Sequence, residues 1–202
     1  MSAVQIQGNA SGTGTLTVAA PSTNTNRTLT LPDGTGTFTV AGVNSNIVAG
    51  TAVASTSGTS IDFTSIPTWV KRITVMFSGV STSSTSLPQI QLGDSGGVEI
   101  TGYNCAASSL AAAAMSTVNA TSGFVLSRAD AASLISGQAV ITLLDAATNT
   151  WAFSSVFGLS NSTFLLVTGG SKPLSGTLDR VRITTVNGTD TFDAGSINIL
   201  YE

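Results

Sequence analysis

The chain has 202 residues, of which 8% are charged and 42% hydrophobic, and its formal net charge is -3 at pH 7. This composition excludes a disordered chain, which is rich in charge and poor in apolar residues, and a helical bundle dominated by Ala, Glu, Lys and Leu. Its 7 Lys and Arg residues are scattered, so we expect no basic patch suited to nucleic acid. The composition therefore favours an all-β globular protein that binds no nucleic acid.

Residues 1–43 differ from the rest of the chain because they repeat a short Thr-rich motif. The sequence Gly-Thr-Gly-Thr-Leu-Thr-Val at residues 12–18 returns as Gly-Thr-Gly-Thr-Phe-Thr-Val at residues 34–40. Between them, Thr and Leu alternate over residues 28–31, ahead of a Pro-Asp-Gly turn at residues 32–34. This pattern predicts an arm of three short strands, each with a Thr face and an apolar face.

The predicted arm needs a partner, because its few large apolar residues cannot offset the entropy of ordering about 40 residues. We expect the partner to be other copies of the same chain, so that the arm both oligomerises and attaches the protein. The residues expected on its apolar interface are Leu16, Val18, Leu29, Leu31, Phe38 and Val40. The alternative is a flexible Thr-rich tail, against which the strict alternation argues.

A connector over residues 44–60, with a small apolar strand at residues 47–53, precedes a knob over residues 61–202. In the knob, short apolar runs alternate with clusters of Gly, Ser, Asn and Asp. The expected strands are residues 61–63, 72–78, 89–92, 98–103, 123–127, 138–144, 150–157, 163–168, 178–185 and 196–201. Their spacing predicts an antiparallel β-sandwich, jelly-roll-like rather than immunoglobulin-like. For residues 106–118, an Ala run flanked by Ser and Thr, we expect at most a short helical turn in a loop.

Histidine is absent, and Cys105 is the only cysteine. Without an imidazole the chain cannot build a Ser-His-Asp or Cys-His nucleophile system or a His-based metal site. A single cysteine forms neither an internal disulfide nor a Cys-rich zinc site, and it leaves the redox compartment open. The sequence therefore predicts a protein that is not an enzyme and needs no cofactor and no metal ion.

Residues 93–97, Gly-Asp-Ser-Gly-Gly, reproduce the pentapeptide around the nucleophile of chymotrypsin-like serine proteases. That nucleophile needs an imidazole to accept its proton, and this chain has none. The same residues are favourable in a tight turn. We therefore interpret Ser95 as a turn residue between two strands.

Asp179, Asp190 and Asp193 are the main local group of carboxylates. Paired acids cleave glycosidic bonds, and grouped oxygen ligands bind calcium. A catalytic acid pair and a calcium site at Asn187, Asp190 and Asp193 are therefore alternatives. The Asn187-Gly188 dipeptide is a strong hairpin signal, so we favour a hairpin with the acids solvated at its flanks.

Trp69, Tyr103, Trp151 and Tyr201 could form a platform for sugar rings. Aromatic residues are only 6% of the chain, however, and both Trp residues lead into apolar strands. We therefore favour the core or the rim of the sandwich for these side chains.

Parts of the chain resemble proteins of tailed-phage virions. Residues 12–21 and 26–37 look like the Thr-rich module of phage fibres and capsid-surface proteins. Residues 63–77 and 178–201 resemble C-terminal β domains of similar phage proteins, especially from marine and cyanobacterial phages. The resemblance implies a homotrimer with an N-terminal β arm and a distal β-sandwich knob, and it implies no catalytic residue.

The function expected from these observations is that of a homotrimeric decoration, or cement, protein at the virion surface. Its expected partners are its own copies and the major capsid protein or another virion protein. The alternative within this class is a tail-fibre tip or receptor-binding protein that recognises a host surface glycan; a depolymerase or a free lectin belongs to other classes. Because the first residues lack a signal-peptide pattern and no window approaches the roughly 18 apolar residues that span a bilayer, we expect synthesis in the host cytoplasm and no membrane partner.

Overall fold

The computed structural model describes residues 47–112, 114–127 and 130–202. The arm predicted for residues 1–43, with its six interface residues, lies outside the described residues, as does the start of the connector. The prediction for the arm therefore stays a prediction. The described fold is that of the knob and the end of the connector.

The described residues form fourteen strands and no helix. The strands are β1 (Val48–Ala49), β2 (Val53–Ala54), β3 (Ser60–Phe63), β4 (Arg72–Thr82), β5 (Pro88–Asp94), β6 (Gly97–Val98), β7 (Asn104–Ala111), β8 (Ala114–Ala120), β9 (Phe124–Val125), β10 (Ile135–Asp145), β11 (Thr150–Leu159), β12 (Leu165–Pro173), β13 (Arg180–Thr185) and β14 (Phe192–Tyr201). They build two antiparallel sheets. The large sheet has the order β1-β14-β4-β10-β11-β12-β7-β8, with β2 also paired to β14, and the small sheet has the order β3-β13-β5-β6, with β9 paired to β5. The predicted all-β architecture of antiparallel sheets is confirmed.

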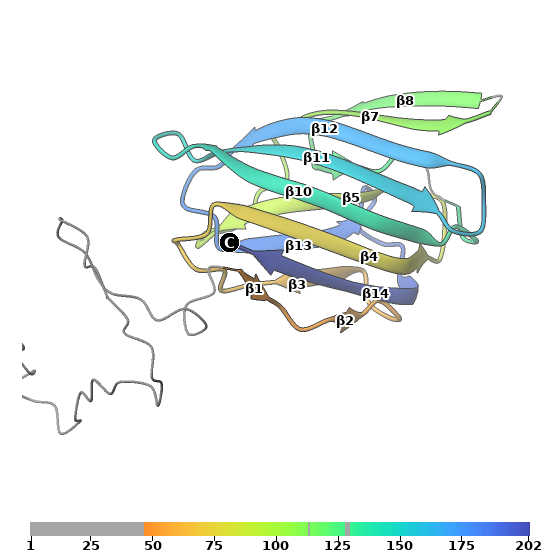
Figure 1. Ribbon diagram of the computed structural model, residues 1–202, viewed down its shortest axis with the longest axis horizontal. Helices are drawn as coiled ribbons and strands as arrows, with labels where there is room; N and C mark the ends of the chain where they lie inside the picture. Colours follow the sequence, from red (N-terminus) through yellow and green to blue (C-terminus); the bar gives the residue numbers. More distant parts are fainter. Residues whose placement is uncertain (1–46, 113, 128–129) are drawn as a thin grey trace, which may run out of the picture. The chain divides into compact units, whose positions relative to one another are not determined.

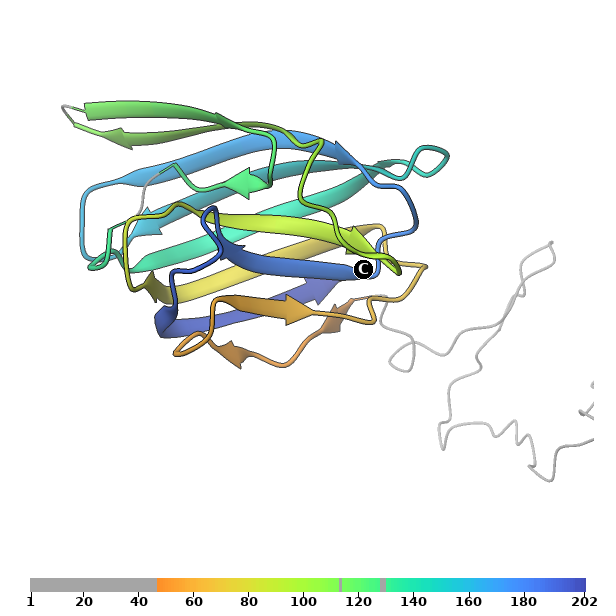
Figure 2. The ribbon, with the colours of Figure 1, turned by 180° about the vertical axis from the view of Figure 1, so that it is seen from behind.

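The two sheets form two layers, as Figure 1 and Figure 2 show from opposite sides. One hydrophobic core of buried side chains from both sheets lies between them. Along β4, Ile73, Val75 and Phe77 are buried, whereas the residues between them are only half-buried. From the small sheet, Val181 and Ile183 of β13 are fully buried in the same core. The alternation follows from the period of two in a strand, which places successive side chains on opposite faces of a sheet.

Aromatic rings contact one another across this core. Phe124 of β9, in the small sheet, stacks on Phe153 of β11, in the large sheet, with ring centres 4.1 Å apart and planes 11° from parallel. Tyr103 meets the Phe124 ring edge-on at 5.0 Å. Each such pair adds roughly 0.5–1.5 kcal/mol beyond the burial of its area. The stacked Phe124 and Phe153 therefore join the two sheets, and the contact with Phe124 fixes the position of the Tyr103 ring.

The prediction for residues 106–118 is wrong, because this segment forms a hairpin and not a helical turn. β7 and β8 pair with each other, and β7 also pairs with β12. Cys105, Ala107 and Ser109 are buried, whereas Ala106 between them is exposed, so the segment alternates with a period of two. Ala and Ser suit either structure, and pairing with β12 overrides the helix propensity of the Ala run.

The other expected strands are present, with different bounds. Residues 47–53 form β1 and the start of β2 instead of one strand, and both pair with β14. Of residues 98–103, only Val98 belongs to a strand, and the rest connects β6 to β7. Several strands continue further than their apolar patterns, through irregular positions such as Gly195 in β14. Its φ is +89°, and a side chain there would meet the Gly79 carbonyl oxygen at 2.4 Å, so this position requires glycine.

Candidate functional site

The Gly-Asp-Ser-Gly-Gly segment is a tight turn, as predicted. Ser95 and Gly96 connect β5 to β6, and Asp94 Oδ1 accepts a hydrogen bond from the Gly96 backbone N at 2.8 Å. Gly93 permits the close pairing of the two strands, because a side chain there would lie 2.3 Å from the Gly97 carbonyl oxygen. These residues thus form a hairpin turn with Ser95 exposed at its tip.

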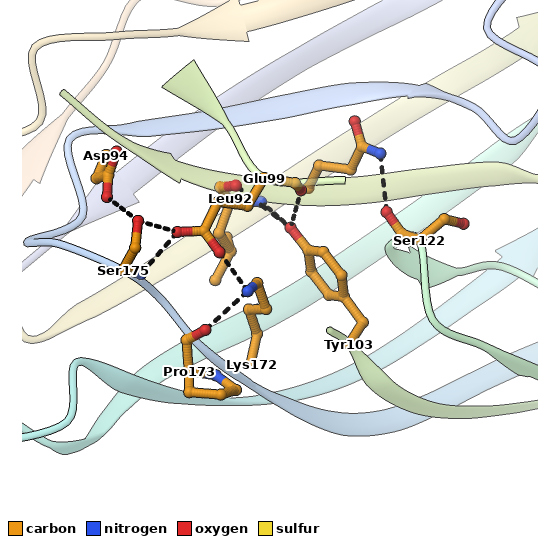
Figure 3. Close-up of polar contacts among 9 residues, drawn as sticks. Leu92, Asp94, Glu99, Tyr103, Ser122, Lys172, Pro173 and Ser175 are labelled. Atoms are coloured by element: carbon orange, nitrogen blue, oxygen red, sulfur yellow. Dashed lines mark hydrogen bonds and ion pairs between the residues drawn. The ribbon is translucent and has the colours of Figure 1, made fainter. Parts of the chain in front are cut away.

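A buried lysine joins the two layers close to this turn (Figure 3). Lys172 of β12 points inward from the large sheet, its side chain is 5% exposed, and it forms an ion pair with Glu99, in the connection after β6. Its ammonium donates a hydrogen bond to the Pro173 carbonyl oxygen at 2.7 Å and lies 5.4 Å from the centre of the Tyr103 ring. A buried ammonium is stable only with such partners, so Lys172 depends on Glu99.

Both carboxylates near Lys172 receive further hydrogen bonds. Glu99 Oε1 accepts one from the Ser175 backbone N at 2.7 Å, and the Ser175 hydroxyl lies 2.8 Å from Glu99 Oε1 and 2.7 Å from Asp94 Oδ2. Burial alone would raise the pKa of Glu99, but hydrogen bonds from Lys172 and Ser175 outweigh it and lower that pKa. Hydrogen bonds from Ser175 and the Gly96 backbone also lower the pKa of Asp94.

Tyr103 completes this group, which we call the Lys172 cluster. Its hydroxyl accepts a hydrogen bond from the Leu92 backbone N at 2.7 Å and donates one to the Glu99 carbonyl oxygen at 2.9 Å. Burial raises the pKa of Tyr103, so it stays protonated. The members of the cluster are Asp94, Glu99, Tyr103, Lys172 and Ser175. Because these polar groups are engaged with one another, we assign the cluster a structural role.

The expected hairpin at Asn187-Gly188 is wrong, because β13 and β14 belong to different sheets. The turn crosses from the small sheet to the large one. Asp190 is buried rather than solvated, with Oδ1 accepting a hydrogen bond from Asn187 Nδ2 at 2.7 Å and Oδ2 one from the Ser86 backbone N at 3.0 Å. Asp193 is exposed, and Asp179 is half-buried and forms an ion pair with its neighbour Arg180. Through these two hydrogen bonds, Asp190 stabilises the turn that crosses from one sheet to the other.

The four aromatic residues considered for a sugar platform lie in two places. Trp151 and Tyr103 are each 3% exposed and belong to the core. Trp69 is 47% exposed and packs against Tyr201, with ring centres 5.8 Å apart. The interpretation of these residues as core or rim is confirmed, and they do not form one platform.

A polar groove of about 340 Å³ lies on the outer face of the small sheet. Cross-strand register aligns two rows of side chains on this face of β3, β13 and β5. The rows are Ser60, Thr184 and Gln89, and Asp62, Arg182 and Gln91. Sequence reasoning missed this groove, although the alternation of Gln89 and Gln91 with two apolar residues is a signal for an outward amide pair.

The amides of the groove are buried but keep hydrogen-bonding capacity. Gln89 and Gln91 are 3% and 4% exposed. Gln91 Nε2 donates to the Ser122 carbonyl oxygen at 2.8 Å, and the Ser122 hydroxyl donates to Gln89 Oε1 at 3.1 Å. Arg182 binds Asp62 through two hydrogen bonds of 2.7 and 3.0 Å. The groove therefore combines fixed amides with a guanidinium whose charge is already balanced.

The outer face of the large sheet has the opposite character. From β10 across β11, β12 and β7 to β8, the outward positions of the described strands carry no charged side chain except Asp145 at the β10–β11 turn. The register places Leu165 beside Leu110 and Leu110 beside Met115, with exposed fractions of 42%, 37% and 72%. Val156, 54% exposed, lies on the same face. We call this surface the neutral face.

Comparison with protein-family models, curated proteins and solved structures finds no match. Among the described residues, no group of three His, Cys, Asp or Glu side chains could hold a metal ion. None of the described residues lies in a helix long and apolar enough to cross a membrane.

Proposed function

We propose that this chain is a non-enzymatic structural protein of a tailed-phage virion, a homotrimer that decorates the capsid surface and attaches through its N-terminal arm. The observation that carries the proposal is the neutral face. The resemblance of residues 12–21 and 26–37 to the Thr-rich module of phage surface proteins supports it. The role requires no chemistry, since a decoration protein acts by burying surface and pairing strands between capsomers.

The neutral face suits permanent contact with other virion proteins. Ordinary soluble surfaces carry about 25–35% charged residues, and covering a charge with protein removes its hydration. A face without charge avoids this cost. The adjacent apolar side chains of Leu165, Leu110 and Met115 add area whose burial favours association.

The edge of the large sheet at β8 offers a second means of association. β8 has seven residues, of which none is charged and none is proline, and it pairs with β7 on one side. Soluble proteins usually block such an edge with charges, proline or a covering segment. The opposite end of the sheet is covered by β1 and β2, which pair with β14. Among the described residues this edge of β8 has no paired strand, and a β strand from another copy, such as a strand of the arm, fits it by β-augmentation.

The finer topology of the knob, jelly-roll-like, is part of the same proposal. Most connections between consecutive strands cross from one sheet to the other, as in β3 to β4 and β13 to β14. This crossing supports the proposal, although β10, β11 and β12 are consecutive neighbours within the large sheet.

A receptor-binding tip that recognises a host surface glycan is the second candidate. It is favoured by the small-sheet groove, which a decoration protein does not need. Mixing the purified protein with expanded capsids that lack it, and separately with host cells, separates the candidates. Binding to capsids supports decoration, whereas binding to cells alone overturns it in favour of the tip.

The arm is tested by two neighbouring substitutions. Three chains of 20.2 kDa give a trimer of about 61 kDa. Leu31→Asp places a charge on the predicted apolar face and should dissociate the trimer, while Thr30→Asp, on the predicted Thr face, should leave it intact. The thermal transition of the knob should change little in both variants. Equal effects on mass measured by light scattering, or a wild-type monomer, would contradict the proposed assembly.

A further inference from the structure

We infer that the small-sheet groove is a binding site for a neutral saccharide, held by the amides of Gln89 and Gln91 beside Arg182. The inference goes beyond capsid decoration, because a groove on the small sheet and an interface on the neutral face involve different residues. It gives the receptor-binding candidate a defined site and ligand class.

Charge selects the class of ligand. Arg182 is the cation in the lining of the groove, and its Nε and Nη2 both donate to the carboxylate of Asp62. This two-point pair balances the guanidinium charge. A phosphate, a sulfated glycan or a nucleic acid would need uncompensated positive charge, so the groove suits a ligand without net charge.

The polar groups match a row of sugar hydroxyls. Each amide presents a donor and an acceptor side by side, and an amide pair at two-residue spacing faces the groove from β5. Among the described residues, Gln91 Oε1 accepts no hydrogen bond. The amide nitrogens of Gln89 and Gln91 each donate one hydrogen bond and carry two hydrogens, so each can donate one more to a ligand. The hydroxyls of Ser60 and Ser122 extend the same lining. Each sugar hydroxyl can both donate and accept a hydrogen bond, so a hydroxyl-rich ligand matches a lining that offers donors and acceptors side by side.

The size and rim of the groove fit the same ligand. Its volume of about 340 Å³ falls at the lower end of the roughly 300–1,000 Å³ of small-ligand sites. Ile100 and Val186, which are 63% and 48% exposed, also line it. These apolar side chains can contact the C–H faces of a sugar ring. The amides are held in place by hydrogen bonds to Ser122 and to the Thr185 carbonyl oxygen, so little ordering is needed on binding.

The test uses the full chain on an array of neutral and anionic oligosaccharides, followed by calorimetry with the best neutral one. The first variant, Gln91→Glu, keeps the side-chain shape but replaces an amide by a carboxylate. Its matched control is Gln138→Glu, an exposed glutamine on β10 of the large sheet. A second variant, Ile100→Glu, alters the rim at a side chain too exposed to affect folding, with Leu144→Glu, 68% exposed, as its control.

We expect the wild-type chain to bind at least one neutral oligosaccharide, and both groove variants to weaken that binding roughly tenfold or more. Both controls should bind like the wild type. Selective binding to anionic glycans would overturn the inference, as would neutral binding that the groove variants leave unchanged. No binding to any oligosaccharide would overturn it too. The trimer mass measured on the same samples reports separately on the proposed assembly, and capsid binding on the proposed decoration role.

Discussion

The two outer faces of the sandwich differ in the polar and charged side chains that they carry. On the small sheet, Asp62, Arg182 and the two glutamines face outward, and Arg182 and the glutamines line the groove. On the large sheet, the outward positions from β10 to β8 are uncharged, apart from Asp145 at a turn. Since both sheets cover the same core, the core does not require this difference. The difference fits the proposal that the neutral face packs against virion proteins, whereas the small-sheet groove binds a ligand.

Lys172 shows how the neutral face, from β10 to β8, stays free of a lysine charge. It is the only cation in β10, β11, β12, β7 and β8 as described, and it points into the molecule. There it meets Glu99 and the Tyr103 ring (Figure 3). An outward-pointing lysine in β12 would place a charge on the neutral face. Lys172, which points inward, instead links the two sheets.

The largest expected effect comes from removing this inward charge. Lys172→Met leaves the partly buried carboxylate of Glu99 without its cation, so we expect the free energy of unfolding to fall by about 3 kcal/mol. Urea unfolding followed by tryptophan fluorescence measures it. Lys71→Met, at an exposed lysine, is the matched control and should stay within about 0.5 kcal/mol of the wild type. Equal stability of the two variants would contradict the linking role of Lys172.

The next effect is a loss of stability in acid. The pKa values of Glu99 and Asp94 are lowered in the folded protein from ordinary values of 4.5 and 3.8. A lowered pKa means that the folded state binds protons less readily than the unfolded one, so these carboxylates stabilise the fold above the unfolded pKa. That contribution is lost as the pH falls through the folded pKa values. We therefore expect the free energy of unfolding to decrease below about pH 4.5.

The acid effect should depend on Lys172. In Lys172→Met, Glu99 loses the cation that favours its charged form, so protonation of Glu99 becomes easier in the folded state. We expect the decrease in stability between pH 6 and pH 3 to be smaller in this variant than in the wild type. An unchanged pH profile would show that Lys172 does not set the pKa of Glu99.

Local sequence patterns predicted most strands but not their placement. The alternation of Ile73, Val75 and Phe77 is visible in the sequence because burial on one face imposes a period of two. The Ala and Ser residues of β7 carry little such contrast, so the hairpin with β8 was missed. Nothing local distinguishes a hairpin from a turn that crosses between sheets, and Asn187-Gly188 was assigned to the wrong one. Whether a turn folds back or crosses is decided by packing between segments distant in sequence.

The groove was beyond prediction for a related reason. Its residues come from β3, β5, β13 and the connections beside them, and the first and last of these, Thr59 and Gly188, are about 130 residues apart in the chain. Only cross-strand register brings Asp62, Arg182 and Gln91 into one row. A sequence shows which face a residue occupies within its strand, but not which strand lies beside it.

A smaller change in stability is expected when a buried and an exposed serine of the same strand are each replaced by alanine. In β11, Ser155 is 6% exposed and its hydroxyl has no hydrogen-bond partner among the described residues, while the neighbouring Ser154 is exposed. An unpaired buried hydroxyl costs stability, so we expect Ser155→Ala to raise the free energy of unfolding by about 1 kcal/mol. Ser154→Ala should leave it unchanged. A loss of stability in Ser155→Ala would show that the hydroxyl has a partner that the fold requires.

The smallest change in stability is expected where the two outer faces are compared directly. Val156 on the neutral face and Val186 at the groove rim are 54% and 48% exposed, so a lysine at either position should change the free energy of unfolding by less than about 0.5 kcal/mol. Their effects on assembly should nevertheless differ. Val156→Lys puts a charge on the surface proposed to pack against virion proteins, where its desolvation opposes contact, whereas Val186→Lys lies on the opposite sheet. Capsid binding, measured by co-sedimentation with capsids that lack the protein, should therefore weaken in Val156→Lys alone. Equal binding by both variants would remove the neutral face as the contact surface, and weaker binding in Val186→Lys alone would assign that contact to the small sheet.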